Sequence, residues 1–488
     1  MLFNSFDFLI FFPVVTTLYF LLPHRYRWCL LLFSSCLFYM AFIPAYILIL
    51  FVTIIVDYYA GILIENATGK AKKRYLILSL VSNLAFLGFF KYFNFAAGNL
   101  NALASFLHWN YSILLLSIAL PVGLSFHTFQ AMAYTMEVYR RNQKAERHFG
   151  IYALYVMFYP QLVAGPIERP QHLIHQFREK HEFDYDRIKS GLLLMLWGLV
   201  KKVVIADRLA MLVNAVYDNP TTYPGPLLIL ATIAFAFQIY CDFSGYSDIA
   251  IGAARVMGFK LMRNFNRPYA SRSVAEFWTR WHISLSSWFR DYVYIPLGGN
   301  RTSPLRWYSN LFLTFLLSGL WHGADWKFII WGALNGFYLL CSIWTKSLRE
   351  KMVQLSGLGR LPRLHRAMQT VFTFSLICLT WIFFRANNLA EAQYIFTHLF
   401  QKAGAAFQPH VMSYWIVKIA GFGKQQIVIA LASVAMLEFV HSLQAKGSVL
   451  EKIQNTPVYC RWPIYCLLIH GILFLGIFKH SQFIYFQF

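Results

Sequence analysis

The stretch PAYILILFVTIIVDYYAGILI at positions 44–64 decides which class of fold this chain can adopt. It holds a single charged residue, Asp57, and it is about as long as the ~20 apolar residues that cross a bilayer as a helix. Its apolar residues are continuous, whereas the strands of a membrane β-barrel alternate between apolar and polar positions. The stretch therefore predicts a membrane-spanning helix.

Similar runs of spanning or near-spanning length follow one another along the whole chain. Several are short or interrupted by Pro and Gly, and such segments re-enter the membrane or line a cavity. We predict an all-α polytopic membrane protein with about ten to twelve crossings and additional interfacial and re-entrant helices. One membrane domain is expected over 1–480, and an aromatic tail over 481–488. The other runs lie at about 5–22, 28–42, 75–95, 112–136, 149–165, 190–206, 226–253, 308–322, 326–344, 368–384, 426–442 and 462–479.

Composition excludes two classes of protein. Hydrophobic residues make up 58% of the chain and charged residues 13%, whereas a soluble domain is about 25% charged. A soluble enzyme and a disordered chain are thus both excluded. The net charge of +22 comes mostly from loops between apolar runs, as the positive-inside rule describes, so no nucleic-acid partner is predicted. The seven cysteines form no CxxC pair and are interpreted as small hydrophobic residues.

The basic loops predict the orientation of the chain. Lys and Arg gather at 70–74, 140–147 and 346–366, which should therefore be cytoplasmic, whereas 98–110 carries no charged residue and suits the opposite side. Counting crossings outward from these loops places both termini outside the cytoplasm.

The segment 255–306 differs from the rest, because nine basic residues stand against two acids, Glu276 and Asp291, among many aromatics. This pattern is typical of amphipathic helices at the cytoplasmic interface. Two functions are open. The residues alone favour anchoring to anionic lipid; the alternative is an aromatic-lined entrance for an anionic, nucleotide-like donor, with Arg280, Trp281 and Trp288 as candidate binding residues.

Two histidines are candidate catalytic groups. His322 lies at the end of an apolar run, where a neutral imidazole could take a proton from a hydroxyl group. The alternative is a packed histidine that bonds to the backbone. His282 lies in the amphipathic segment, and its alternative is an interfacial position beside lipid headgroups.

Two acids, Asp242 and Asp248, interrupt the run at 226–253. They could carry protons, bind a cation or cap a broken helix. We expect buried carboxylates paired with arginines or with backbone N–H groups, because an unpaired charge inside a membrane is costly.

The tail SQFIYFQF at 481–488 carries one phenol, Tyr485. A free end can thread into a cavity, and a phenol can accept an acyl group when a base removes its proton. The alternative is that the aromatic residues anchor the tail at the membrane interface.

Four motifs together resemble the membrane-bound O-acyltransferase family. They are LVAGPIERP at 162–170, QIYCDFSGYSD at 238–248, the block EFWTRWHISLSSWFRDYVYIPLGGNR at 276–301, and LWHG at 320–323. The bacterial branch with the alginate and peptidoglycan O-acetyltransferase membrane subunits is the most similar. The resemblance implies a ring of helices around a central region where a cytoplasmic and an external funnel meet. It also implies that His322 is the catalytic histidine and that His282 is the second motif histidine.

The resemblance further implies a relay across a bacterial cytoplasmic membrane. Acetyl-CoA would donate its acetyl group from the cytoplasm, and Tyr485 would carry that group. A separate extracytoplasmic transferase of the SGNH type would then acetylate a polysaccharide. The implied reaction requires no metal. Besides acetyl-CoA and the transferase, the expected partners are membrane lipids.

Two other functions remain open. The same fold could transfer D-alanine or another acyl group. A polytopic transporter or flippase would explain the interrupted helices and the acids Asp242 and Asp248 without any chemistry.

Overall fold

The computed structural model describes residues 1–117, 120–162, 165–478 and 483–484, and within these ranges all regular structure is helical. Seven helical segments are long and apolar enough to cross a membrane, which confirms the prediction of an all-α polytopic membrane protein. The number of about ten to twelve crossings stays a prediction. The seven segments are Pro44–Asn66, Gly69–Phe106, Gly225–Met257, Trp326–Trp344, Pro362–Arg385, Lys424–Gln444 and Val458–Leu475.

The chain forms two compact units. The first unit comprises Met1–Met195 and Tyr246–Met262, and the second comprises Leu196–Gly245 and Arg263–Phe488. Helix α12 (Gly225–Met257) contributes its first part to the second unit and its last part to the first. The single domain expected over 1–480 stays a prediction.

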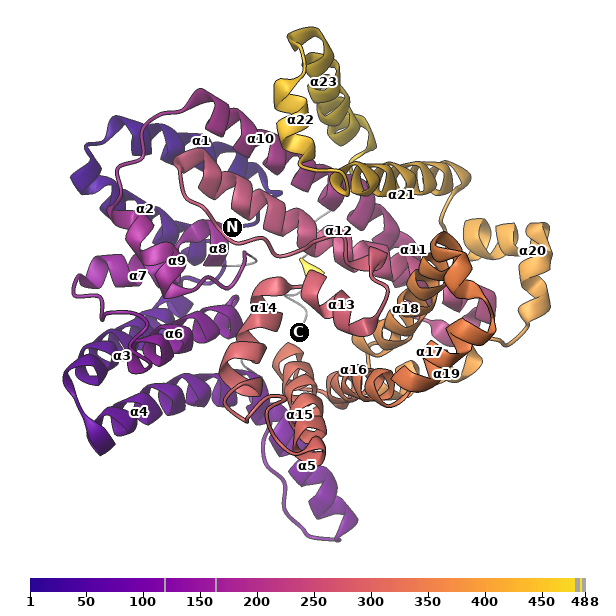
Figure 1. Ribbon diagram of the computed structural model, residues 1–488, viewed down its shortest axis with the longest axis horizontal. Helices are drawn as coiled ribbons and strands as arrows, with labels where there is room; N and C mark the ends of the chain where they lie inside the picture. Colours follow the sequence, from indigo (N-terminus) through magenta and orange to yellow (C-terminus); the bar gives the residue numbers. More distant parts are fainter. Residues whose placement is uncertain (118–119, 163–164, 479–482, 485–488) are drawn as a thin grey trace. The chain divides into compact units, whose positions relative to one another are not determined.

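In the first unit, helices α3, α4 and α6 pack against one another (Figure 1). Asp57, the charged residue of the apolar run at 44–64, is fully buried there. Its Oδ1 accepts a hydrogen bond from Ser79 Oγ at 2.6 Å, and its Oδ2 accepts one from Asn83 Nδ2 at 2.8 Å. The run tolerates this acid because both oxygens have donors. The elements that begin in this unit are α1 (Phe6–Leu21), α2 (His24–Met40), η1 (Pro44–Tyr46), α3 (Ile47–Asn66), α4 (Gly69–Leu87), η2 (Gly88–Tyr92), α5 (Phe93–Phe106), α6 (Leu124–Tyr139), α7 (Phe149–Met157), α8 (Tyr159–Leu162), α9 (Pro170–Leu173), η3 (Ile174–Arg178) and α10 (Tyr185–Leu199).

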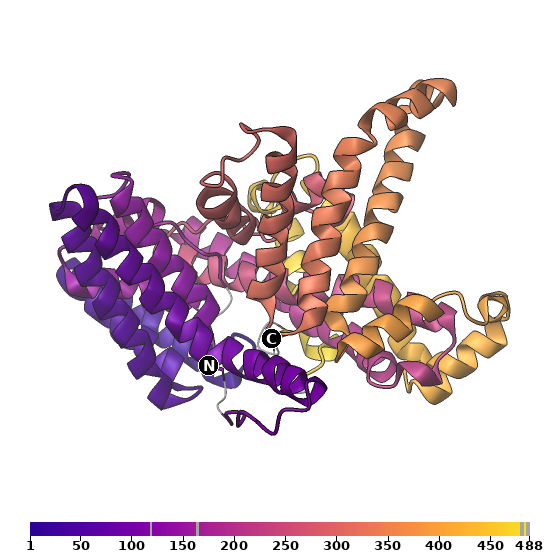
Figure 2. The same ribbon diagram turned by 90° about the horizontal axis from the view of Figure 1, so that it is seen from below.

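The second unit holds the long helices α15, α16 and α18 and the short helices before them. Figure 2 shows the orange helices α16 and α18 running side by side, with α17 between them along the chain. The elements of this unit, besides α12, are η4 (Val200–Ala206), α11 (Asp207–Tyr217), η5 (Pro220–Thr222), η6 (Pro268–Ala270), α13 (Val274–Arg280), α14 (Ile283–Phe289), η7 (Arg290–Tyr294), α15 (Pro304–His322), α16 (Trp326–Trp344), α17 (Lys346–Leu355), η8 (Leu358–Arg360), α18 (Pro362–Arg385), α19 (Leu389–His398), η9 (Ala403–Phe407), α20 (Pro409–Ser413), η10 (Tyr414–Ile419), α21 (Lys424–Gln444), α22 (Val449–Asn455) and α23 (Val458–Leu475).

Helices α15 and α16 approach each other closely because glycines face each other where they meet. A Cβ atom added to Gly319 would run into the carbonyl oxygen of Phe328 and lie 3.1 Å from the Cα of Gly332. Small residues allow membrane helices to pack backbone against backbone. Since His322 ends α15, this contact fixes the position of that histidine.

We expect Gly319→Ala to lower the stability of the protein, because the added methyl group would force α15 away from α16 at a cost of about 1–3 kcal/mol. Thermal unfolding of the purified protein in detergent measures this effect. Gly98→Ala is the matched control, because Gly98 also lies in a helix but has open space around it. Equal unfolding midpoints for both variants would contradict this account of the contact.

Candidate active site

His322 is the last residue of α15 and is enclosed by aromatic rings. The centroid of its imidazole lies 5.0 Å from that of Trp321, 5.0 Å from that of Trp331 and 5.3 Å from that of Phe384. Only 5% of the residue is exposed. The histidine therefore sits among aromatic rings and is shielded from solvent.

His282 lies between α13 and α14 in a left-handed backbone conformation, with φ 43° and ψ 55°. A residue other than glycine holds this conformation only where its surroundings enforce it. Here the amide N–H of the next residue, Ile283, donates to the carbonyl oxygen of Asn264 at 2.9 Å. The His282 side chain is buried, and its Nδ1 lies 3.1 Å from Asn264 Oδ1. Asn264 thus holds both the backbone and the ring.

The contacts of Asn264 determine which nitrogen of His282 carries the proton. The backbone N–H of Ser284 also donates to Asn264 Oδ1, at 3.3 Å, so this atom must be the acceptor oxygen of the amide. Nδ1 of His282 is then the donor, and Nε2 carries the lone pair of a neutral ring. Burial lowers the pKa of His282 to about 3, which keeps the ring neutral at physiological pH.

Ring contacts join the two histidines to the C-terminal segment within the second unit. The ring centroid of His282 lies 6.3 Å from that of Trp321, which adjoins His322, and 4.7 Å from that of Phe243. Phe243 in turn lies 5.7 Å from the ring of Phe483. We call His322, Trp321, His282, Phe243 and Phe483 the histidine cluster. Tyr485, the predicted acyl carrier, lies outside the described residues.

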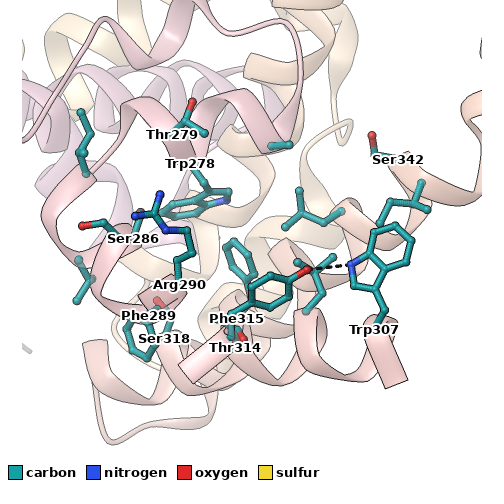
Figure 3. Close-up of a pocket in the computed structure, with 18 residues that line it drawn as sticks. Trp278, Thr279, Ser286, Phe289, Arg290, Trp307, Thr314, Phe315, Ser318 and Ser342 are labelled. Carbon is teal, nitrogen blue, oxygen red and sulfur yellow. Dashed lines mark hydrogen bonds between the residues drawn. The ribbon is translucent and has the colours of Figure 1, made fainter. Parts of the chain in front are cut away.

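A pocket of about 450 Å³ lies in the second unit among α13, α14, η7, α15 and α16 (Figure 3). Its walls include the aromatic rings of Trp278, Phe289 and Phe315 and the hydroxyl groups of Thr314 and Ser318. Ser318 precedes His322 by one turn of α15, and another lining residue, Ile283, directly follows His282. Residues close in sequence to both candidate histidines therefore line the pocket, although neither histidine is among its lining residues.

The three residues predicted to bind a donor do not line this pocket. Arg280 is paired with Glu276 at 2.6 Å. Trp281 is buried against Trp381, and Trp288 against Tyr292. Their role in donor binding stays a prediction. Within the same segment the pocket is lined instead by Trp278 and by the exposed Arg290.

We expected Asp242 to pair with an arginine or with a backbone N–H group, and it has a partner of the second kind. Its Oδ2 accepts a hydrogen bond from the backbone N–H of Ile484 at 2.8 Å. Its Oδ1 pairs with Lys202 at 2.7 Å, so a lysine stands where we expected an arginine. Lys202 and Asn264 were both missed by the sequence reasoning. A lysine inside the apolar run at 190–206 was a usable signal, whereas nothing in the sequence links Asn264 to His282.

The arrangement suits proton transfer in a site shielded from water. Two buried imidazoles lie in aromatic surroundings, and a neutral imidazole can act as a general base. Among the described residues, no three His, Cys, Asp or Glu side chains converge as metal ligands would.

Comparisons with known proteins identify related chains. The model of the MBOAT, membrane-bound O-acyltransferase family matches residues 76–386. A probable alginate O-acetylase AlgI of Pseudomonas aeruginosa is 41% identical over 405 residues, which cover 82% of this chain and 75% of the relative. A peptidoglycan O-acetyltransferase of Helicobacter pylori is 33% identical over 504 residues, covering 94% and 91%. A teichoic acid D-alanyltransferase of Bacillus subtilis is 28% identical over 276 residues, covering 54% and 68%.

We expect Asn264→Ala to destabilise the segment around His282, because buried donors on His282 and Ser284 would lose their acceptor, at about 1–3 kcal/mol for each. The midpoint of thermal unfolding in detergent should fall by several degrees. Asn266→Ala is the matched control, since the hydrogen bond of Asn266 to Arg280 is made by its backbone N–H. The same midpoint in both variants would show that Asn264 does not hold this segment.

Proposed function

This chain belongs to the membrane-bound O-acyltransferase family, and we propose that it carries acetyl groups across a bacterial cytoplasmic membrane for the modification of a polysaccharide. Acetyl-CoA is the cytoplasmic donor, and Tyr485 on the extracytoplasmic tail is the first acceptor. A separate transferase of the SGNH type receives the group outside. The names of the alginate and peptidoglycan O-acetyltransferase relatives support acetyl as the group and a polysaccharide as the final acceptor.

The observation that carries this proposal is the burial of Phe483 and Ile484. Phe483 packs against Phe243, and Phe243 contacts His282. A tail that only anchored the chain at the membrane surface would not need to bury these two residues beside a ring that touches His282. Since Tyr485 follows two residues after Phe483, the packing supports a phenol that reacts within this site.

The proposed reaction transfers one acetyl group from sulfur to oxygen. His322 takes the proton of the Tyr485 hydroxyl as the phenolic oxygen attacks the thioester carbonyl carbon. The carbon–sulfur bond breaks, and the CoA thiolate leaves with the proton that His322 returns. The products are O-acetyl-tyrosine and free CoA. The transferase outside then takes the acetyl group from the tyrosine, which restores the phenol.

The tautomer of His282 narrows the role that we propose for it. With its proton on Nδ1 and directed to Asn264, the neutral ring offers Nε2 as an acceptor. An oxyanion needs donors, so this tautomer argues against oxyanion stabilisation by His282. We assign His282 to orienting a hydroxyl or thiol group in the site.

One alternative has support from the comparisons. The D-alanyltransferase relative makes D-alanine a second candidate for the transferred group. Membership of an acyltransferase family replaces the transporter hypothesis, because that hypothesis involves no covalent change.

We expect Ser318→Trp to raise the KM for acetyl-CoA at least tenfold, because an indole at this position would fill the pocket that Ser318 lines. The rate of CoA release as a function of acetyl-CoA concentration measures this effect. Ser309→Trp is the matched control, since Ser309 lies exposed on the same helix. An unchanged KM in Ser318→Trp would show that this pocket does not bind the donor.

The relay itself is tested by mass spectrometry of the C-terminal peptide after the purified protein has met isotope-labelled acetyl-CoA. We expect label on Tyr485 in the wild type and none in His322→Ala or Tyr485→Phe. The matched controls are His470→Ala and Tyr459→Phe, because both residues are exposed on α23. Labelled D-alanyl donor on its natural carrier tests the alternative group in the same assay.

Three results decide among the proposals. Label that disappears in both site variants and persists in both controls supports the relay. Release of CoA without a labelled tail would show that the protein cleaves the thioester but that the acceptor is a group other than Tyr485. Label from the D-alanyl donor alone would replace acetyl with D-alanine.

A further inference from the structure

We propose that Asp242 is a positioning residue that docks the C-terminal tail by binding its main chain. The backbone N–H of Ile484 donates to Asp242 Oδ2 at 2.8 Å, and the two residues are 242 positions apart in the sequence. Ile484 is 4% exposed and Asp242 3% exposed. The hydrogen bond is therefore shielded from water, where a charged acceptor strengthens it.

A buried lysine pairs with the carboxylate of Asp242. Nζ of Lys202 lies 2.7 Å from Asp242 Oδ1 and 2.8 Å from Asp207 Oδ1. All three side chains are buried. A buried carboxylate persists only when ion pairs and hydrogen bonds replace its hydration. One oxygen of Asp242 faces the ammonium group of Lys202, and the other faces the tail.

Consecutive residues of α12 hold consecutive residues of the tail. Phe243 packs its ring against Phe483 at 5.7 Å and 64°, while Asp242 binds the backbone of Ile484. The first contact is apolar and the second is polar, so the pair fixes both the position and the direction of the segment. Because Phe243 also touches His282, docking at 242–243 sets the tail in register with the histidine cluster.

The π-helix η4 (Val200–Ala206) supports the chain just before the tail as well as the docking site. The backbone N–H of Ile477, just after α23, donates to the carbonyl oxygen of Val203 at 2.9 Å. Arg208, in the helix that follows η4, donates to the carbonyl oxygen of Leu475, the last residue of α23. Lys202 lies on η4 as well, so one short element supports both the end of α23 and the lysine that pairs with Asp242. Such π-helical turns occur frequently at functional sites.

The contact can be removed by a single substitution at position 484. Every amino acid except proline supplies the backbone N–H that Asp242 binds. Ile484→Pro therefore deletes the donor at the very end of the chain, whereas Ile484→Val keeps it. Asp242→Ala deletes the acceptor but also takes a partner from Lys202. If that variant fails to fold, the two substitutions at position 484 still decide the question.

Hydrogen–deuterium exchange of the full-length proteins in detergent measures docking directly. We expect the C-terminal peptide to be protected in the wild type and in Ile484→Val. In Ile484→Pro and Asp242→Ala the remaining amides of this peptide should exchange at least tenfold faster. Equal exchange in all four proteins, or loss of protection in Asp242→Ala but not in Ile484→Pro, would overturn the proposal.

A second experiment reads the function of the docking site and rests on the proposed acetyl relay. The peptide SQFIYFQF is added in trans to Ile484→Pro, and its labelling by acetyl-CoA is followed by mass spectrometry. Adding Asp242→Ala to this protein should raise the half-saturating peptide concentration about 10- to 100-fold, as the loss of a hydrogen bond to a charged group predicts. The maximal labelling rate should change much less, since Asp242 does not touch the reacting atoms.

The two experiments fail separately. If exchange changes as expected but no protein or peptide is labelled, the docking site stands and the acetyl relay is wrong. If labelling occurs and its peptide dependence is the same with and without Asp242, the relay stands and Asp242 has no positioning role.

Discussion

Every polar group that this chain places in its apolar interior needs a partner, because water is not there to supply one. Three buried groups show how the structure meets this requirement. Ser79 and Asn83 satisfy Asp57, Lys202 and the backbone of Ile484 satisfy Asp242, and Asn264 satisfies His282. These pairings join helices that are distant in the sequence. The polar groups thus determine where segments meet, while the apolar surface supplies most of the favourable free energy.

The two histidines are held by different means, and the difference suits different tasks. His322 is enclosed by the faces and edges of aromatic rings, which restrict its position and exclude water. The Nδ1 atom of His282 faces Asn264 Oδ1, and this contact sets the tautomer of the ring. The enclosure suits the role of general base that we propose for His322, because it keeps water away from the proton transfer. The fixed direction of the Nε2 lone pair suits the orienting role that we propose for His282.

Local patterns in the sequence predicted the helices well and the partners poorly. The runs at 44–64 and 226–253 are helices α3 and α12, because continuous apolar residues of this length have few other stable forms in a membrane. The run at 112–136 differs. Its helix α6 begins only at Leu124, after Gly123 with a φ of 76°. A residue with this positive φ cannot be part of an α-helix, so the helix begins only after Gly123. The hydropathy of a segment does not show where such a backbone conformation occurs.

The site was predicted in part, for a related reason. His322 stands out because ionisable residues are rare in apolar segments, and His282 stands out through the motif that resembles the family's. Asn264 and Lys202 become significant only through residues far away in the sequence. The aromatic residues of 276–301 gave no sign of which face would be buried, so Trp281 and Trp288 were favoured while Trp278 lines the pocket. On helices as short as α13 and α14, contacts with the rest of the unit decide which side chains point inward.

The hydrogen bond between Asp242 and the main chain of Ile484 has a consequence for how the end of this protein can evolve. A hydrogen bond to the peptide backbone imposes by itself no requirement on the side chain at that position, apart from excluding proline. Apolar residues that fit the buried space of Ile484 can therefore replace it without loss of the contact, provided that the distance along the chain from α23 is kept. Among diverging descendants of this chain, the tail would therefore be recognisable by its length and its spacing from α23 even after its amino-acid sequence is no longer similar.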